Sequence, residues 1–196
     1  MEKYLESSKY IDWKSPEINN LAKSLSSGCE YDEEIAKNCF EWVRDNIKHS
    51  VDFKLNPVTC KASQVLNHKT GYCYAKSHLL AALLRANSIP AGLCYQRLSL
   101  EDNGAPYCLH GLNAVFLKKY GWYRIDARGN KESVNAQFKP PYEQLAFPIN
   151  SKLEADLPEI WSSPLPEVVS VLEKYETYLQ VYDNLPDIEL PKGTKK

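Results

Sequence analysis

The sequence predicts an α+β fold in which helices come first and antiparallel strands follow. Apolar residues recur at helical spacing over residues 35–47, and they fill nearly every position of residues 79–84. Alternation of apolar and polar residues then marks strands at 92–98, 107–117 and 121–126. Helices grouped before strands, rather than alternating with them, are typical of α+β proteins.

Composition points to an ordinary globular domain. The chain has 196 residues, of which 43% are apolar and 25% are charged. A formal net charge of -1 gives no electrostatic case for nucleic acid or for an anionic membrane surface. No stretch approaches the roughly 20 apolar residues that a membrane helix needs. We therefore predict a single domain over residues 1–196 that binds neither nucleic acid nor membrane.

The cysteines indicate free thiols. All six are scattered without a CxxC pair, at positions 29, 39, 60, 73, 94 and 108. The first residues lack the basic start and apolar run of a signal peptide, so we expect a cytoplasmic protein in which most thiols are buried for packing. Zinc prefers paired ligands at short spacing, and none are paired here, so we predict no metal site. We also predict that the protein uses no cofactor.

Helices are predicted in the first half of the chain. Ser15 and Pro16 favour a helix start, and we expect that helix over residues 16–27. Acidic residues open a second helix at 32–34, which should end near Lys48. Residues 51–59 should form a connector, and residues 62–66 a short helical turn.

The chain is organised around the stretch Thr70–Arg85. Gly71 shortly precedes Cys73, and the helix that follows is apolar on most sides, which predicts a central helix ended by Ile89-Pro90. Unpartnered N–H groups and the helix dipole stabilise a thiolate at the N-terminus of such a helix. Cys73 is therefore the candidate nucleophile, and a buried core thiol is the alternative interpretation.

The second half should end in a wrap and a helix. A loop is expected over 101–106, followed by a hairpin of the strands 107–117 and 121–126. Frequent prolines over 139–166 predict an extended wrap over the surface. Residues 167–181 should form an amphipathic closing helix, and residues 192–196 a disordered tail.

A nucleophilic cysteine needs a base, and the base needs an orienting group. His110 begins the first hairpin strand, and Asp126 ends the second. Residues an even number apart share one face of a strand, so a register that pairs even with even positions would bring the two together. A slip of one residue would separate them, and the sequence leaves the register open. Cys108, two residues before His110, is expected to pack, with protection or oxidation of Cys73 as the alternative.

Four blocks in this order resemble the transglutaminase-like superfamily of papain-type fold, specifically its small single-domain bacterial members. They are Trp42-Val43-Arg44-Asp45-Asn46-Ile47, Gly71-Tyr72-Cys73 through Ile89-Pro90-Ala91, His110 through Val115, and Gly121 through Asp126. The resemblance covers about residues 35–130, and it implies a catalytic core at about 31–130. It also implies a Cys–His–Asp triad of Cys73, His110 and Asp126. Leu112 stands where the family often has an aromatic residue, which changes the expected pocket wall.

The resemblance implies a cysteine acyltransferase or amidohydrolase that acts through a thioester on amide substrates, either a protein glutamine or a peptide bond. The backbone N–H of Cys73 is the expected first oxyanion donor, and a side-chain amide from Asn67 or Gln64 the second. Candidates for the substrate cleft are Tyr72, Tyr74, Tyr95 and Trp122. The partner would be a protein, a peptide or a small amide.

Two alternatives remain open at this stage. The chain could be a non-catalytic binding or scaffold module that keeps the fold, because a fold alone does not prove a function. It could also be an arylamine-acetyltransferase-like enzyme that uses acetyl-CoA and shares the triad, although the arginine-rich cysteine motif of those enzymes is not seen. Transfer and hydrolysis are not distinguished, and the oligomeric state is open.

Overall fold

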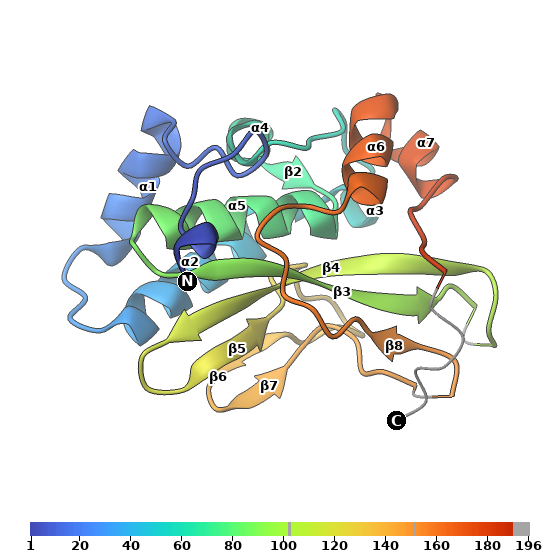
Figure 1. Ribbon diagram of the computed structural model, residues 1–196. Coiled ribbons are helices and arrows are strands. Elements are labelled where there is room, and N and C mark those ends of the chain that lie inside the picture. Colours follow the sequence, from blue (N-terminus) through green and yellow to red (C-terminus); the bar gives the residue numbers. More distant parts are fainter. Residues whose placement is uncertain (102, 151, 190–196) are drawn as a thin grey trace.

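The computed structural model describes residues 1–101, 103–150 and 152–189. Helices form one layer and a curled antiparallel sheet forms the other (Figure 1). The helices are α1 (Pro16–Ser26), α2 (Asp32–Asn46), α3 (Ser50–Phe53), α4 (Ala62–His68), α5 (Cys73–Ala86), α6 (Pro166–Lys174) and α7 (Tyr178–Tyr182), with a short 3-10 helix at Glu2–Tyr4. The predicted α+β class is confirmed.

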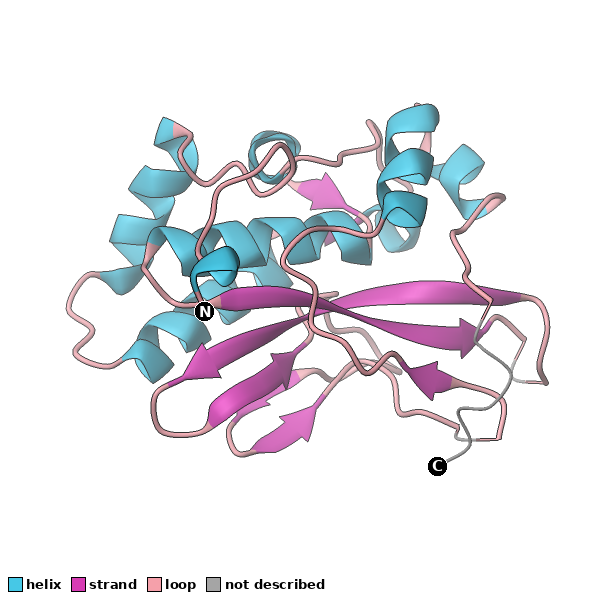
Figure 2. Ribbon diagram, viewed as in Figure 1, coloured by secondary structure: helices cyan, strands magenta, loops and turns pink. Residues whose placement is uncertain are grey.

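The main sheet is antiparallel and has the order β5-β4-β3-β8 (Figure 2). Its strands are β3 (Ala91–Ser99), β4 (Tyr107–Leu117), β5 (Gly121–Ile125) and β8 (Ala155–Asp156). Two smaller pairs accompany it. The parallel pair is β1 (Lys48–His49) with β2 (Thr70–Gly71), and the antiparallel pair is β6 (Gln137–Lys139) with β7 (Tyr142–Gln144).

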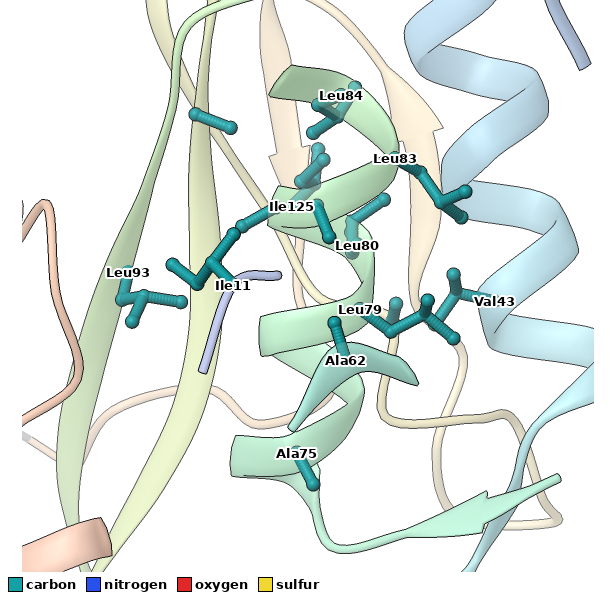
Figure 3. Close-up of a cluster of buried hydrophobic side chains, with 14 of the residues drawn as sticks. Ile11, Val43, Ala62, Ala75, Leu79, Leu80, Leu83, Leu84, Leu93 and Ile125 are labelled. Carbon is teal, nitrogen blue, oxygen red and sulfur yellow. The ribbon is translucent and has the colours of Figure 1, made fainter. Parts of the chain in front are cut away.

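Helix α5 is the centre of the molecule, as predicted. Every residue from Cys73 to Arg85 is buried, because α1, α2 and α4 pack on some of its sides and β3 and β4 on others. Figure 3 shows leucines of α5 between Val43 of α2 and Ile125 of β5. Burying apolar surface on several faces holds the helix firmly, and so holds the position of its first residue, Cys73.

The prediction of one closing helix over 167–181 is wrong, because the structure has two helices there. Tyr175 has extended backbone, with φ -108° and ψ 146°, and ends α6. Thr177 then starts α7: its side chain accepts a hydrogen bond from the Gln180 N–H, and the Gln180 side chain accepts one from the Thr177 N–H. This capping box favours a new start over continuation.

The wrap predicted over 139–166 starts at the last residue of β6 and ends at the first residue of α6. Between them it contains β7 and β8, and the other described residues there lie outside the named helices and strands. The tail predicted at 192–196 lies outside the described residues. Within the described residues, no helix is long and apolar enough to cross a membrane.

Candidate active site

Cys73 is the first residue of α5, and its side chain faces the sheet. Tyr72 is the residue before the helix and has extended backbone, which turns the chain from β2 into α5. The Cys73 Sγ accepts a hydrogen bond from the backbone N–H of Gly111 on β4, with N and S 3.4 Å apart. The sulfur therefore lies between the N-terminus of the central helix and the strand that carries His110.

His110 and Asp126 lie side by side. The β4–β5 hairpin pairs Ala114 with Arg124, which is the even-with-even register. His110 Nε2 and Asp126 Oδ2 are 2.8 Å apart, and both side chains are buried. Backbone N–H groups of Arg128 and Ala146 each donate to the Asp126 carboxylate at 3.0 Å. Asp126 is thus held by three donors at a fixed distance from the imidazole.

The electrostatics favour a charged pair. Burial lowers the pKa of His110, but the charges of Asp126 and Cys73 more than offset it and raise the pKa to about 10. Burial raises the pKa of Asp126, whereas the His110 charge and the hydrogen bonds to the carboxylate bring it below its ordinary value. An imidazolium paired with a carboxylate is the form in which a histidine stabilises a nearby thiolate.

A cavity of about 730 Å³ opens onto Cys73 and His110. Cys73 and His110 line it together with an apolar wall that includes Leu98, Leu109, Phe147 and Leu185. The Phe147 ring meets the imidazole of His110 edge-on, with centroids 5.0 Å apart, and thereby shields the His110–Asp126 pair from solvent. The charged residues Asp52, Arg128 and Lys131 also line the cavity.

Two of the four predicted cleft aromatics line this cavity. Tyr72 and Tyr74 do so, each buried and hydrogen-bonded through its hydroxyl to a backbone carbonyl, of Tyr178 and Leu109 respectively. Tyr95 and Trp122 do not, which corrects that part of the prediction. Tyr95 packs on Trp161, and Trp122 packs on Phe116 at the turn end of the hairpin, far along the strands from His110.

Neither predicted amide donor reaches the cavity. Gln64 is exposed, and its Oε1 accepts hydrogen bonds from the backbone N–H groups of Cys60 and Lys61, which places it at the N-terminus of α4. Asn67 is exposed on α4 and does not line the cavity. This is a correction: proximity in sequence to Cys73 did not bring either amide to the sulfur, because α4 is separated from α5 by β2.

Sequence reasoning missed His49, Phe147 and Arg128 as cavity residues. His49 reaches the site through the pairing of two-residue strands, and a pairing that short leaves no periodic pattern. Phe147 lies in irregular chain after β7. Arg128 follows the hairpin in irregular chain, and its guanidinium binds Asp52 through two hydrogen bonds, of 2.6 and 3.0 Å.

The family model of the transglutaminase-like superfamily matches residues 19–127. No curated protein sequence matches the chain. Among solved structures, a candidate cysteine protease from Cytophaga hutchinsonii is 22% identical, with a TM-score of 0.50 over 64% of this chain and 40% of that one. The periplasmic domain of TgpA from Pseudomonas aeruginosa is 16% identical, with a TM-score of 0.46 over 63% of this chain and 45% of that one.

The chain thus spans less than half of either of these structures, and at this identity the first of them shows a shared fold alone. The match to the family model, by contrast, is a match of sequence. It runs from α1 to the residue after Asp126, covers more than half of the 196 residues, and contains the helix-tip cysteine and the His–Asp hairpin. The chain belongs to the transglutaminase-like superfamily.

Proposed function

We propose that the protein is a cysteine acyltransferase or amidohydrolase that acts on the amide group of a protein, a peptide or a small molecule. Cys73 is the nucleophile, His110 transfers protons, and Asp126 orients and stabilises the imidazole. The observation that carries the proposal is that His110, paired with the buried Asp126 at 2.8 Å, lines the same cavity as a cysteine at a helix N-terminus.

In this proposal the two ring nitrogens of His110 have different tasks. Nε2 is bound to Asp126, so Nδ1 is the nitrogen left for proton transfer. Nδ1 takes the thiol proton, and the Cys73 sulfur then bonds to the carbonyl carbon of the substrate. The C–N bond breaks as Nδ1 returns that proton to the leaving nitrogen, which leaves a thioester on Cys73. An amine or water then attacks the thioester and regenerates the thiol.

The negative charge that develops on the substrate oxygen needs donors already in place, each typically worth about 3 kcal/mol. The backbone N–H of Cys73 is the first, because the first N–H groups of a helix have no partner within it. With Asn67 and Gln64 remote from the cavity, the other N–H groups at the start of α5 are the nearest further donors on that element.

Limited alkylation with iodoacetamide, followed by peptide mass spectrometry, tests the proposal. Cys108 is a matched control for access, because it lines the same cavity, while burial and the nearby Cys73 raise its pKa to about 12. We expect Cys73 to react at least tenfold faster than Cys108 at neutral pH, and His110→Asn to abolish that difference.

Turnover gives the second readout. Amide hydrolysis or amine transfer should be lost in Cys73→Ser and fall at least a hundredfold in Asp126→Asn, which leaves the imidazole unoriented. Equal labelling of Cys73 and Cys108 in the wild type would contradict an activated thiol.

A further inference from the structure

A second histidine, His49, lines the cavity and has no role in the proposed mechanism. Strand β1 pairs in parallel with β2, and His49 lies opposite Gly71, two residues before Cys73. Its ring packs edge-on against Tyr72, with centroids 5.6 Å apart. His49 therefore lines the cavity from β1, whereas His110 lines it from β4 of the main sheet.

The side chain is held in an unusual way. His49 is only 7% exposed, and its Nδ1 is enclosed without a hydrogen-bond partner among the described residues. The Asp52 carboxylate faces this nitrogen, with its Oδ2 3.8 Å away. Asp52 itself is fixed by Arg128 and Lys131. Because a carboxylate repels a nitrogen lone pair, this arrangement favours the tautomer with the proton on Nδ1.

The ring is neutral at physiological pH. Burial is the main reason that the pKa of His49 lies well below its ordinary value, and the charges of Arg128, Lys76 and His110 act in the same direction. The charge of Asp52 opposes them without reversing the effect. A neutral imidazole protonated on Nδ1 has a lone pair on Nε2 and can only accept a hydrogen bond there.

We infer that His49 is a specificity residue whose Nε2 accepts a hydrogen bond from the N–H of the scissile amide and thereby speeds the cleavage of amide substrates but not of ester substrates. The inference rests on the proposed function. In the tetrahedral intermediate, holding one N–H at Nε2 turns the nitrogen lone pair toward the His110 side of the cavity. The proton on His110 then passes to that nitrogen, the C–N bond breaks, and the amine leaves. An ester oxygen has no hydrogen to offer and gains nothing from His49.

A matched substrate pair tests this inference: one N-acyl peptide as its p-nitroanilide, which has the N–H, and as its p-nitrophenyl ester, which lacks it. The values of kcat/KM report acylation for both. The variant His49→Asn keeps a donor near the Nδ1 position but removes the Nε2 acceptor. We expect it to lower kcat/KM for the anilide about tenfold or more. The value for the ester should stay within about twofold. His49→Gln, whose Oε1 can reach the Nε2 position, should restore much of the anilide activity.

Parallel losses on both substrates, or a glutamine variant no better than the asparagine variant, would overturn the inference and give His49 a structural or oxyanion role. Alkylation of Cys73 separates this failure from that of the proposed function. If the thiol of the wild type is activated and remains so in both variants, the substrate comparison decides the role of His49 alone. A wild-type Cys73 that reacts no faster than Cys108 would remove the proposed function and this inference together.

Discussion

At the scale of single residues, Lys76 is an ionisable side chain buried on the central helix. It lies one turn after Cys73 on α5 and is 1% exposed. Its Nζ donates to the backbone carbonyls of Ile47 and Arg44, which ties α5 to the end of α2. Burial, helped by the charge of Arg128, lowers the pKa of Lys76 to about 7, although Asp126 and other carboxylates oppose the shift.

This shift makes stability depend on pH. Between the folded-state pKa of about 7 and the ordinary 10.5, the unfolded chain binds a proton that the folded chain does not, so the free energy of unfolding rises with pH. Between pH 7 and pH 10.5, we expect the free energy of unfolding of the wild type to rise by roughly 3–5 kcal/mol more than that of Lys76→Met. The figure rests on about 1.4 kcal/mol per pKa unit. Urea unfolding at both pH values measures this gain.

Lys37→Met, on the exposed face of α2, is the control and should follow the wild type at both pH values. The free energies of unfolding of the wild type and Lys76→Met could instead differ by the same amount at pH 7 and pH 10.5. That result would contradict the lowered pKa and show that Lys76 stays fully charged in the folded protein.

At the scale of elements, the site depends on how closely β4 approaches the start of α5. A Cβ on Gly111 would lie 2.9 Å from Tyr74 Cδ1 and 3.1 Å from Tyr74 Cα. Because one of these atoms is backbone, α5 or β4 must move to make room. That movement would lengthen the hydrogen bond from the Gly111 N–H to Cys73 Sγ and separate His110 from the sulfur.

Gly111→Ala should therefore lower the alkylation rate of Cys73 at least tenfold and cost about 1–3 kcal/mol of stability through overpacking. Gly28→Ala is the matched control. Gly28 has φ +79° and open space around it, so alanine there strains the backbone without touching the site. The control should lose stability while Cys73 keeps its reactivity. A Gly111→Ala protein with unchanged Cys73 reactivity would show that the close approach is unnecessary.

Some helices and strands could be predicted from the sequence, and others could not. The central helix and the hairpin were predictable because helical and strand periodicities run through them for many residues. The break between α6 and α7 was not, since the apolar spacing continues across Thr177 and only the capping box with Gln180 reveals the new start. Gln64 was misplaced for a related reason: its amide caps α4, a local use that competes with any distant role. His49 was missed because strands of two residues give no pattern.

At the scale of the whole molecule, the cavity draws on segments far apart in the chain. His49, Cys73, His110, Phe147 and Leu185 come from β1, α5, β4 and two irregular segments. The last segment is anchored by the Leu109 N–H, which donates to the Pro186 carbonyl at 2.7 Å, and by the ion pair of Arg97 with Asp187. The site exists only when these segments are folded together, so the prediction of a single domain bears directly on function.

Three buried cysteines can test whether the chain unfolds as one unit. Cys39 on α2 and Cys60 before α4 belong to the main core, whereas Cys94 on β3 belongs to a separate cluster with Leu112 and Ala114. Burial raises the pKa of each thiol to about 12, so none should react before it is exposed. We expect all three to be labelled at one rate in moderate urea, after correction for their rates in the unfolded chain, because a single domain exposes both clusters in one transition.

This common labelling rate should equal the rate at which the helical circular dichroism signal is lost in the same urea concentration. The dichroism thus provides a measure of unfolding that does not depend on any one thiol. Labelling of Cys94 ahead of the other two would contradict a single cooperative unit. Leu145 and Ile160 pack on the Cys94 cluster, so early reaction there would mean that the chain around these residues opens while the helix layer stays folded. Phe147 and Ala146 lie in that same region, and its opening would also uncover His110 and remove a donor from Asp126. The order in which the three thiols react therefore decides whether the His–Asp pair shares the stability of the core or depends on a separately opening segment.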